Sequence, residues 1–122
     1  MPDSARPWRI VFSPSAQSDI DEALRWGHEW FGERAVQRYR ILLRQALRDI
    51  AANPELAGSR ARPEYAGGIR TYHLAFSRTR AASKGGYVKE PRHVTVYRPQ
   101  GEKEVLIVRV LHESSELNRH ME

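Results

Sequence analysis

The sequence predicts an α+β domain in which a hairpin of two helices packs on one face of a small, twisted, mainly antiparallel β-sheet. Two observations predict this fold. After one short β-rich run, apolar residues recur at helical spacing through the first half of the chain. Alternating, β-branched segments then fill the second half. The expected order is β-α-α-β-β-β, in one domain at residues 8–122 that follows an N-terminal tail at residues 1–7.

A short strand and a capped helix are expected first. Residues 9–13 (RIVFS) are rich in β-formers. Ser13 followed by Pro14 is typical of a helix start, because the hydroxyl caps free backbone N–H groups and proline suits the first helical turn. Apolar residues then recur at helical spacing over residues 16–31, and Gly32 ends this helix.

A second helix is expected almost at once. Its apolar stripe covers residues 36–50, and Pro54 ends it. Two amphipathic helices joined by so short a turn form an antiparallel hairpin, which needs a sheet to cover. Trp26 and Trp30 extend the apolar face of the first helix sideways. Residues 55–68 have no clear period and are expected to form a loop.

Three strands should supply the covered surface. We expect them at residues 69–76 (IRTYHLAF), 94–98 (VTVYR) and 104–112, with a turn at residues 99–103. The last run is apolar on both faces, which is typical of the central strand of a sheet. Arg109 interrupts one of these faces, and its simplest role is to pair with a carboxylate or a carbonyl.

A basic insert lies between the second and third of the expected strands. Residues 77–92 contain Gly85-Gly86 and five basic residues against Glu90 alone. We expect this insert to be too polar to pack and to form a mobile loop or hairpin tip. In the tail after His112, serines could cap a further short helix.

The charge of the chain suggests an acidic partner. The formal net charge is +5 with a pI near 10.0, and 17 of the 20 basic residues are arginines. Arginine binds phosphate and carboxylate groups bidentately, so nucleic acid and acidic protein segments both fit. A coding bias would explain the preference for arginine over lysine, but not the excess of positive charge. On the second helix, Arg40, Arg44 and Arg48 form either a solvated face or a docking face.

Several classes of protein and site are disfavoured. The chain has no cysteine, no apolar run long enough to cross a bilayer and no visible signal peptide, so we expect a cytoplasmic protein. Its five histidines lack metal-ligand spacing, and its glycine pairs do not match a phosphate-binding loop. We therefore expect no metal and no cofactor.

The order of these segments resembles the ParE branch of the RelE/ParE toxins, which belong to plasmid-stabilisation and other type II toxin–antitoxin systems. The matching segments are FSPSAQSDIDEAL, GIRTYHLAF, VTVYR and IVRVLHESSELNRHM, which together span about residues 9–121. The basic insert is the departure, because compact members of the family join these two strands by a much shorter turn.

The resemblance implies one of two activities. RelE-like members cleave mRNA on the ribosome, whereas ParE-like members poison DNA gyrase without hydrolysing a substrate. RNA cleavage needs a base, cations for the phosphate and an acid, which RelE takes from lysines, arginines and a C-terminal tyrosine. This chain lacks those lysines and that tyrosine, which favours a gyrase inhibitor with no catalytic residue. If the chain is an endoribonuclease, the candidate residues are Arg70, Arg92, His112 and Glu113.

The family also implies a partner, a ParD-like antitoxin whose disordered segment folds on the toxin in a hetero-oligomer. We expect no membrane contact and no direct DNA binding by the toxin alone. The candidate antitoxin-binding residues are Trp26, Trp30, Tyr39, Arg70 and Arg98. The candidate target-binding residues are Arg92, Arg109, His112 and Arg119. Core packing for the aromatic residues and a structural role for His112 are the alternatives. A further alternative for the whole chain is a non-toxic protein that regulates its operon together with the antitoxin.

Overall fold

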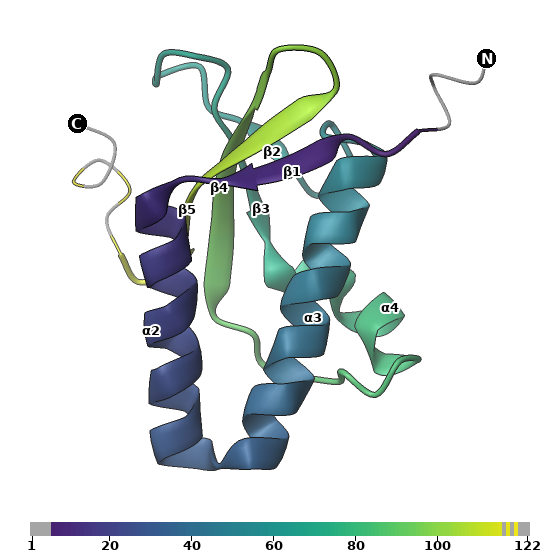
Figure 1. The fold of residues 1–122 in the computed structure, drawn as a ribbon, viewed down its shortest axis with the longest axis vertical. Helices are drawn as coiled ribbons and strands as arrows, with labels where there is room; N and C mark the ends of the chain where they lie inside the picture. Colours follow the sequence, from purple (N-terminus) through teal and green to yellow (C-terminus); the bar gives the residue numbers. More distant parts are fainter. Residues whose placement is uncertain (1–5, 116, 118, 120–122) are drawn as a thin grey trace.

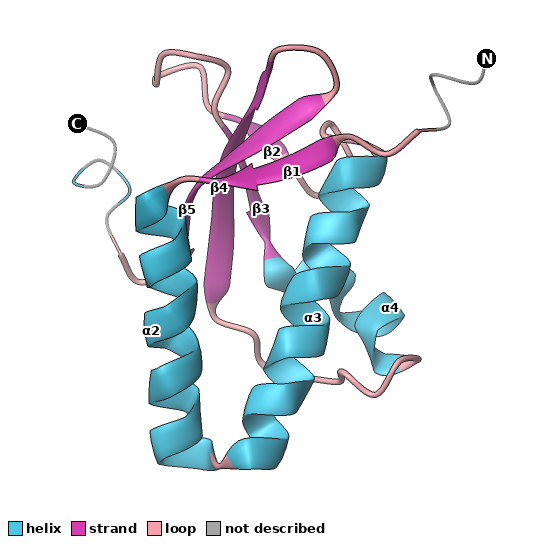
Figure 2. Ribbon diagram, viewed as in Figure 1, coloured by secondary structure: helices cyan, strands magenta, loops and turns pink. Residues whose placement is uncertain are grey.

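The protein consists of a helical hairpin and a short third helix packed on a five-stranded sheet (Figures 1 and 2). The computed structural model describes residues 6–115, 117 and 119. The elements are β1 (Arg9–Phe12), α2 (Pro14–Phe31), α3 (Glu33–Ala52), β2 (Arg60–Ala61), β3 (Arg70–His73), the 3₁₀ turn η1 (Leu74–Ser77), α4 (Arg78–Ala82), β4 (His93–Gln100) and β5 (Glu104–His112). The predicted α+β class and the helical hairpin are confirmed. No helix within the described residues is both long enough and apolar enough to cross a membrane.

The sheet has the strand order β1-β5-β4-β3-β2. Only the pair of β1 and β5 is parallel among the described strands, so the sheet is mainly antiparallel as expected. β5 is an interior strand between β1 and β4, which explains why it is apolar on both faces. β2 is a two-residue strand inside the segment expected to be a loop, so the prediction for residues 60–61 was wrong.

The hairpin begins and turns where the sequence predicts. The Ser13 hydroxyl accepts a hydrogen bond from the Ala16 N–H (2.9 Å) and donates one to the Val108 carbonyl (2.7 Å). The same side chain therefore caps α2 and fixes the start of the helix to β5. Gly32 joins the two helices with φ +87°, a conformation that favours glycine.

The main core lies between the hairpin and the sheet. Its largest fully buried side chains include Leu42 and Ile50 of α3 and Tyr72 and Tyr97 of the sheet. A buried tyrosine needs a partner for its hydroxyl. Tyr97 donates to the carbonyl of Pro54 (2.6 Å), which holds the end of α3 against β4. A smaller cluster on the opposite face of the sheet contains Ile69, Val96 and Leu111.

The prediction for the basic insert was wrong. β3 ends at His73 rather than at residue 76, and the chain continues through η1 and α4 beside α3 (Figure 1). Ser77 and Ala81 are fully buried. The insert packs because its polar groups find partners on α3: Ser77 (2.6 Å) and Arg80 (2.8 Å) both donate to the Asp49 carboxylate.

A β-bulge changes the alternation of side chains along β5. Val96 pairs with Arg109 and Tyr97 with Ile107, so Val108 is the extra residue. Beyond the bulge, Val110 joins the core beneath the helices. The resulting register places His93 directly opposite His112 at the end of the β4–β5 ladder.

Candidate functional site

A groove of about 1350 Å³ runs between the hairpin and the end of β5. The second half of α2, the first half of α3, the last residues of the basic insert and the C-terminal part of β5 form its walls. Its lining includes five of the residues proposed from the sequence: Trp26, Tyr39, Arg92, Arg109 and His112. The insert therefore forms one wall of the groove, contributing Tyr87 and Lys89 among others.

Exposed aromatic side chains surround this groove. Trp26 (55% exposed), Trp30 (68%), Phe31 (66%) and Tyr87 (52%) are four of the six large apolar side chains that are exposed in the described part of the chain. The Trp26 ring contacts those of Trp30 and Phe31, with centroids 6.2 and 5.6 Å apart. Exposed apolar side chains gathered in one place are typical of an interaction site, and tryptophan and tyrosine are frequent anchors there.

The α2 helix exposes Trp26, Trp30 and Phe31 because its buried residues lie nearer its N-terminus. Ala16 and Ile20 pack in the core, and both lie in the first half of the helix. Further along, Gly27 has no side chain to bury, and a Cβ at this position would lie 3.6 Å from Cγ2 of Val36 in α3. The tip of the hairpin thus extends beyond the sheet (Figure 2), so tryptophans on this part of α2 have no sheet to cover.

Partly buried, uncharged polar groups form the floor of the groove. The Tyr39 hydroxyl hydrogen-bonds to Nδ1 of His93, whose ring lies edge-on to that of His112 with centroids 5.6 Å apart. Burial lowers the pKa of His93 to about 4, and the nearby His112 and His73 lower it further. Burial also raises the pKa of Tyr39. Both side chains are therefore neutral near pH 7.

Glu113 is held by two basic side chains next to this floor. His73 lies 2.7 Å away through Nε2, and Arg92 lies 2.9 Å away through Nη1. The Ala75 N–H donates to Nδ1 of His73, which leaves Nε2 as the proton donor to Glu113. These bonds, with that from His73 the largest cause, lower the pKa of Glu113 to about 2. Arg92 also pairs with Glu90 at 2.8 Å, so two carboxylates share its charge.

Arg109 forms a bidentate ion pair with Asp19 of α2. Two of its nitrogens, Nε and Nη2, donate to the two carboxylate oxygens at 2.8 Å each. Asp19 also accepts the backbone N–H of Val110 at 3.0 Å. β1 pairs with β5 only as far as Ile107, so it provides no acceptor for the Val110 N–H. The Asp19 carboxylate provides that acceptor instead. Pairing of Arg109 with a carboxylate is confirmed.

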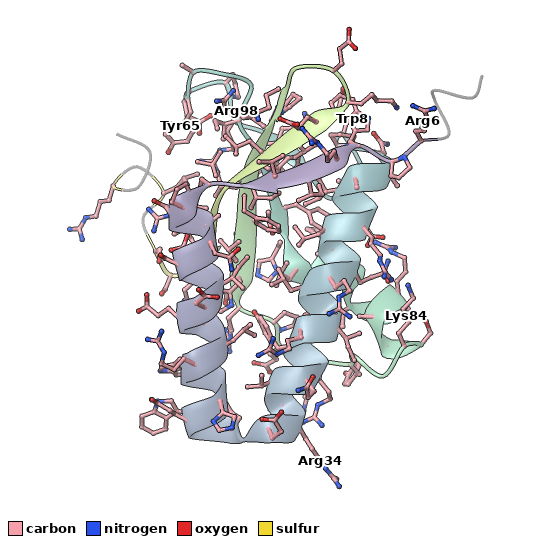
Figure 3. All side chains as sticks on the ribbon, in the orientation of Figure 1. Arg6, Trp8, Arg34, Tyr65, Lys84 and Arg98 are labelled. Carbon is pink, nitrogen blue, oxygen red and sulfur yellow. The ribbon has the colours of Figure 1, made fainter. Side chains whose placement is uncertain are left out.

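The structure gathers some of the candidate residues and separates others. Arg70 begins β3, at the end of the strand away from His73, and Arg98 lies beside Gly67 (Figure 3). Neither lines the groove, so the four ribonuclease candidates do not come together. Arg119 is exposed, and the expected C-terminal helix falls mostly outside the described residues.

Sequence reasoning missed His93 and Asp19. The pairing of His93 with His112 depends on the bulge, since counting residues back from the turn places His93 opposite Leu111 instead. Asp19 had no sequence signal beyond its place on the helix, because its partners lie about 90 residues away. Within the described residues, no group of three or more His, Cys, Asp or Glu side chains could hold a metal ion.

Two comparisons with known proteins bear on this fold and site. The sequence model of a family described as the ParE toxin of the type II toxin–antitoxin system, parDE, matches residues 10–117. A solved structure described as the chromosomal ParDE toxin–antitoxin system from P. aeruginosa contains a chain of similar fold, with a TM-score of 0.60. The two chains are 15% identical, and the alignment covers 86% of this chain and 95% of that one. No curated protein matches the sequence.

Proposed function

Because the chain belongs to the ParE toxin family of type II toxin–antitoxin systems, we propose that it acts as a toxin that inhibits DNA gyrase by binding, and that a ParD-like antitoxin neutralises it. One observation carries the proposal beyond the family. The candidate cations Arg92 and Arg109 of the groove are paired with carboxylates, whereas its aromatic groups are exposed. Such a surface is suited to binding a protein and poorly suited to acid–base chemistry on RNA.

The ionisation of the polar groups argues against a ribonuclease. A carboxyl whose pKa is about 2 is a weak base, and a histidine whose pKa is about 4 is neutral near pH 7 and so is not the imidazolium that a general acid requires. Arg92, the nearest cation for a phosphate, already pairs with Glu90 and Glu113. An RNA phosphate would have to displace one of these carboxylates before Arg92 could bind it.

The exposed aromatic residues suit an antitoxin segment that folds on binding. Trp26 and Trp30 offer large, rigid contact areas, and Tyr39 lies in the floor between the two helices. Arg38 and Lys89 line the same groove, and neither pairs with a carboxylate among the described residues, so acidic side chains of the segment could pair with them. A segment that also reached Arg70 and Arg98 would have to wrap to the other end of the sheet.

The first experiment measures gyrase directly. Purified toxin should inhibit supercoiling of relaxed plasmid DNA and leave cleaved DNA bound to gyrase, while transcripts in expressing cells stay intact. Adding the antitoxin encoded beside the toxin gene should restore supercoiling. Transcripts cleaved at ribosome-dependent positions, with gyrase unaffected, would overturn the proposal in favour of an mRNA interferase. Unaffected gyrase, intact transcripts and harmless expression would instead favour a non-toxic regulator of the operon.

A matched pair of variants separates antitoxin binding from folding. Trp26→Ala together with Trp30→Ala should weaken the antitoxin complex by at least about thirtyfold, because even one anchoring side chain of this kind contributes about 2 kcal/mol or more. Thermal stability should change little, since both rings are more than half exposed. Phe76→Ala, another exposed aromatic side chain away from the groove, serves as the control and should leave the affinity unchanged.

A second pair of variants tests the ribonuclease alternative. Glu113→Gln removes one carboxylate from Arg92, and Glu102→Gln makes the same change of charge in the exposed turn between β4 and β5. If Arg92 is an RNA ligand, Glu113→Gln alone should tighten the binding of single-stranded RNA, measured by fluorescence anisotropy at fixed ionic strength. We expect the two variants to behave alike, because the cluster around Arg92 holds the tail to the sheet rather than a phosphate.

A further inference from the structure

A second cavity, of about 640 Å³, lies at the other end of the sheet from the groove. It opens where α3 ends, between the loop that joins β2 to β3 and the turn that joins β4 to β5. Trp8, at the start of β1, and Tyr65, in the β2–β3 loop, both line it, and Figure 3 labels both. The volume falls within the range of small-molecule sites.

The cavity is lined mainly by positive charge. Arg62, Arg70 and Lys103 line it, and Glu55 is the one carboxylate among the lining residues. Glu55 is exposed. Arg62 pairs with Glu64, so Arg70 and Lys103 are the two lining cations without a carboxylate partner among the described residues, and two such cations favour an anion with more than one negative charge.

Two of these cations are held in place by aromatic rings. The Arg62 guanidinium lies over the Tyr65 ring, 5.6 Å from its centroid, and also pairs with Glu64 at 2.9 Å. The Lys103 ammonium lies over the Trp8 ring at 5.5 Å. A cation stacked on an aromatic ring keeps its N–H donors for another partner. Because the ring already restricts the side chain, ligand binding loses less side-chain entropy than it would with a freely moving cation.

Arg70 has unused hydrogen-bonding capacity. Its Nη2 donates to the Ser59 hydroxyl at 2.8 Å, but its Nε is buried and donates to no acceptor. No carboxylate pairs with Arg70 among the residues that the structure describes. The C-terminal end of a helix favours a nearby cation, and α3 ends beside this cavity. The carbonyl of Pro54, just beyond the helix, already accepts a hydrogen bond from the Tyr97 hydroxyl. Because no carboxylate pairs with Arg70 within the described residues, its guanidinium keeps its charge and N–H groups for an anion in the cavity.

We propose that this cavity binds a phosphate monoester, with Arg70 and Lys103 as the cations that hold the phosphate. A phosphate monoester carries a charge of about −1.5 to −2 at pH 7 and can therefore pair with both Arg70 and Lys103, whereas a single carboxylate balances only one of these two cations. The cavity is larger than a phosphate, so the esterified group also has space. The site is independent of the groove and of the proposed gyrase binding.

The three tryptophans provide an internal control for the experiment. Trp8 lines the cavity, whereas Trp26 and Trp30 lie at the far tip of the hairpin. The probes are inorganic phosphate, adenosine 5′-monophosphate, adenosine, acetate and a 5′-phosphorylated DNA hexanucleotide, titrated into the full chain at constant ionic strength. The readout is the chemical shift of each indole N–H in ¹H–¹⁵N NMR spectra, assigned by Trp→Phe variants.

We expect phosphate and the monophosphate to shift the Trp8 signal and to leave the signals of Trp26 and Trp30 unchanged. Arg70→Gln should weaken this binding by about tenfold or more, because hydrogen bonds between charged groups contribute at least about that much. Arg44→Gln, the same change of charge on the exposed face of α3, should not weaken it. If Arg70→Gln shifts all three indole signals in the absence of ligand, this variant perturbs the fold. In that case Lys103→Gln is the second variant, which should also weaken phosphate binding.

The source of the phosphate follows from the same titrations. Tighter binding of the monophosphate indicates a free ester, and tighter binding of the hexanucleotide indicates a nucleic-acid end, and both support the site. The proposed site would be overturned if adenosine bound as tightly as its monophosphate, or acetate as tightly as phosphate. It would also be overturned if Arg44→Gln lost as much phosphate affinity as the cavity variants. An unchanged Trp8 signal with every probe would overturn it as well.

Discussion

Removing the Asp19 carboxylate should be one of the most destabilising single changes outside the apolar core. Asp19 accepts two hydrogen bonds from Arg109 and one from the Val110 backbone, and its side chain is 12% exposed against 22% for that of Arg109. A hydrogen bond to a charged group contributes about 1.5–3 kcal/mol, and partial exposure lowers the total for such a pair. We expect Asp19→Ala to lower the free energy of unfolding by about 3 kcal/mol.

The matched control is Asp21→Ala, two residues further along the same helix. Asp21 is exposed and accepts one hydrogen bond, from Gln17 at 3.2 Å, so its loss should cost less than about 0.5 kcal/mol. Urea unfolding followed by circular dichroism measures both variants. The double variant Asp19→Ala/Arg109→Ala should be less destabilised than the sum of the two single variants, because it removes both charges. Equal stability of Asp19→Ala and Asp21→Ala would refute the structural role assigned to this pair.

Three further predictions concern pH and helix capping. The pKa of His93 falls from 6.5 to about 4 on folding, so its contribution to stability is present above pH 6.5 and is lost as the pH falls toward 4. The free energy of unfolding should decline over this window by up to about 1.4 kcal/mol per pH unit. His93→Gln should flatten this decline in urea titrations. The pKa of Glu113 falls from 4.5 to about 2, so its contribution is present above pH 4.5 and lost toward pH 2; an unchanged acid limb in Glu113→Gln would contradict this. Ser13→Ala should cost about 1 kcal/mol in thermal unfolding, whereas Ser15→Ala, at an exposed position, should cost almost nothing.

Local signals predicted the helices well because their limits are set by neighbouring residues. The Ser13 hydroxyl caps the start of α2, and Gly32 ends the helix with a positive φ. Both residue types can be identified directly in the sequence as signals of a helix start and a helix end. The bulge in β5 and the strand β2 depend on which segments pair. That depends on contacts between residues far apart in the chain, for which a single sequence carries no local signal.

The basic insert shows why average polarity was a poor guide to packing. Residues 77–92 look too charged to be buried, yet the charges divide between pairing and exposure. Arg80 pairs with Asp49, and Lys84 donates to Gln45. A polar segment can pack when each charge meets a partner on the surface it covers, but the sequence does not identify that partner. Gly86 completes the contact, since a Cβ there would lie 2.3 Å from Cγ2 of Ile41.

The same reasoning explains which part of the candidate site could be predicted. Trp26 and Tyr39 were proposed because tryptophan and tyrosine are typical interface anchors, and His112 because of the family resemblance; all three line the groove. Whether a charged side chain is available to a partner, however, depends on what pairs with it inside the protein. Arg92 and Arg109 are both occupied by carboxylates, so the sequence identified their location but not their availability. For a toxin of this family, the exposed aromatic residues are therefore the side chains most able to make new contacts at the groove.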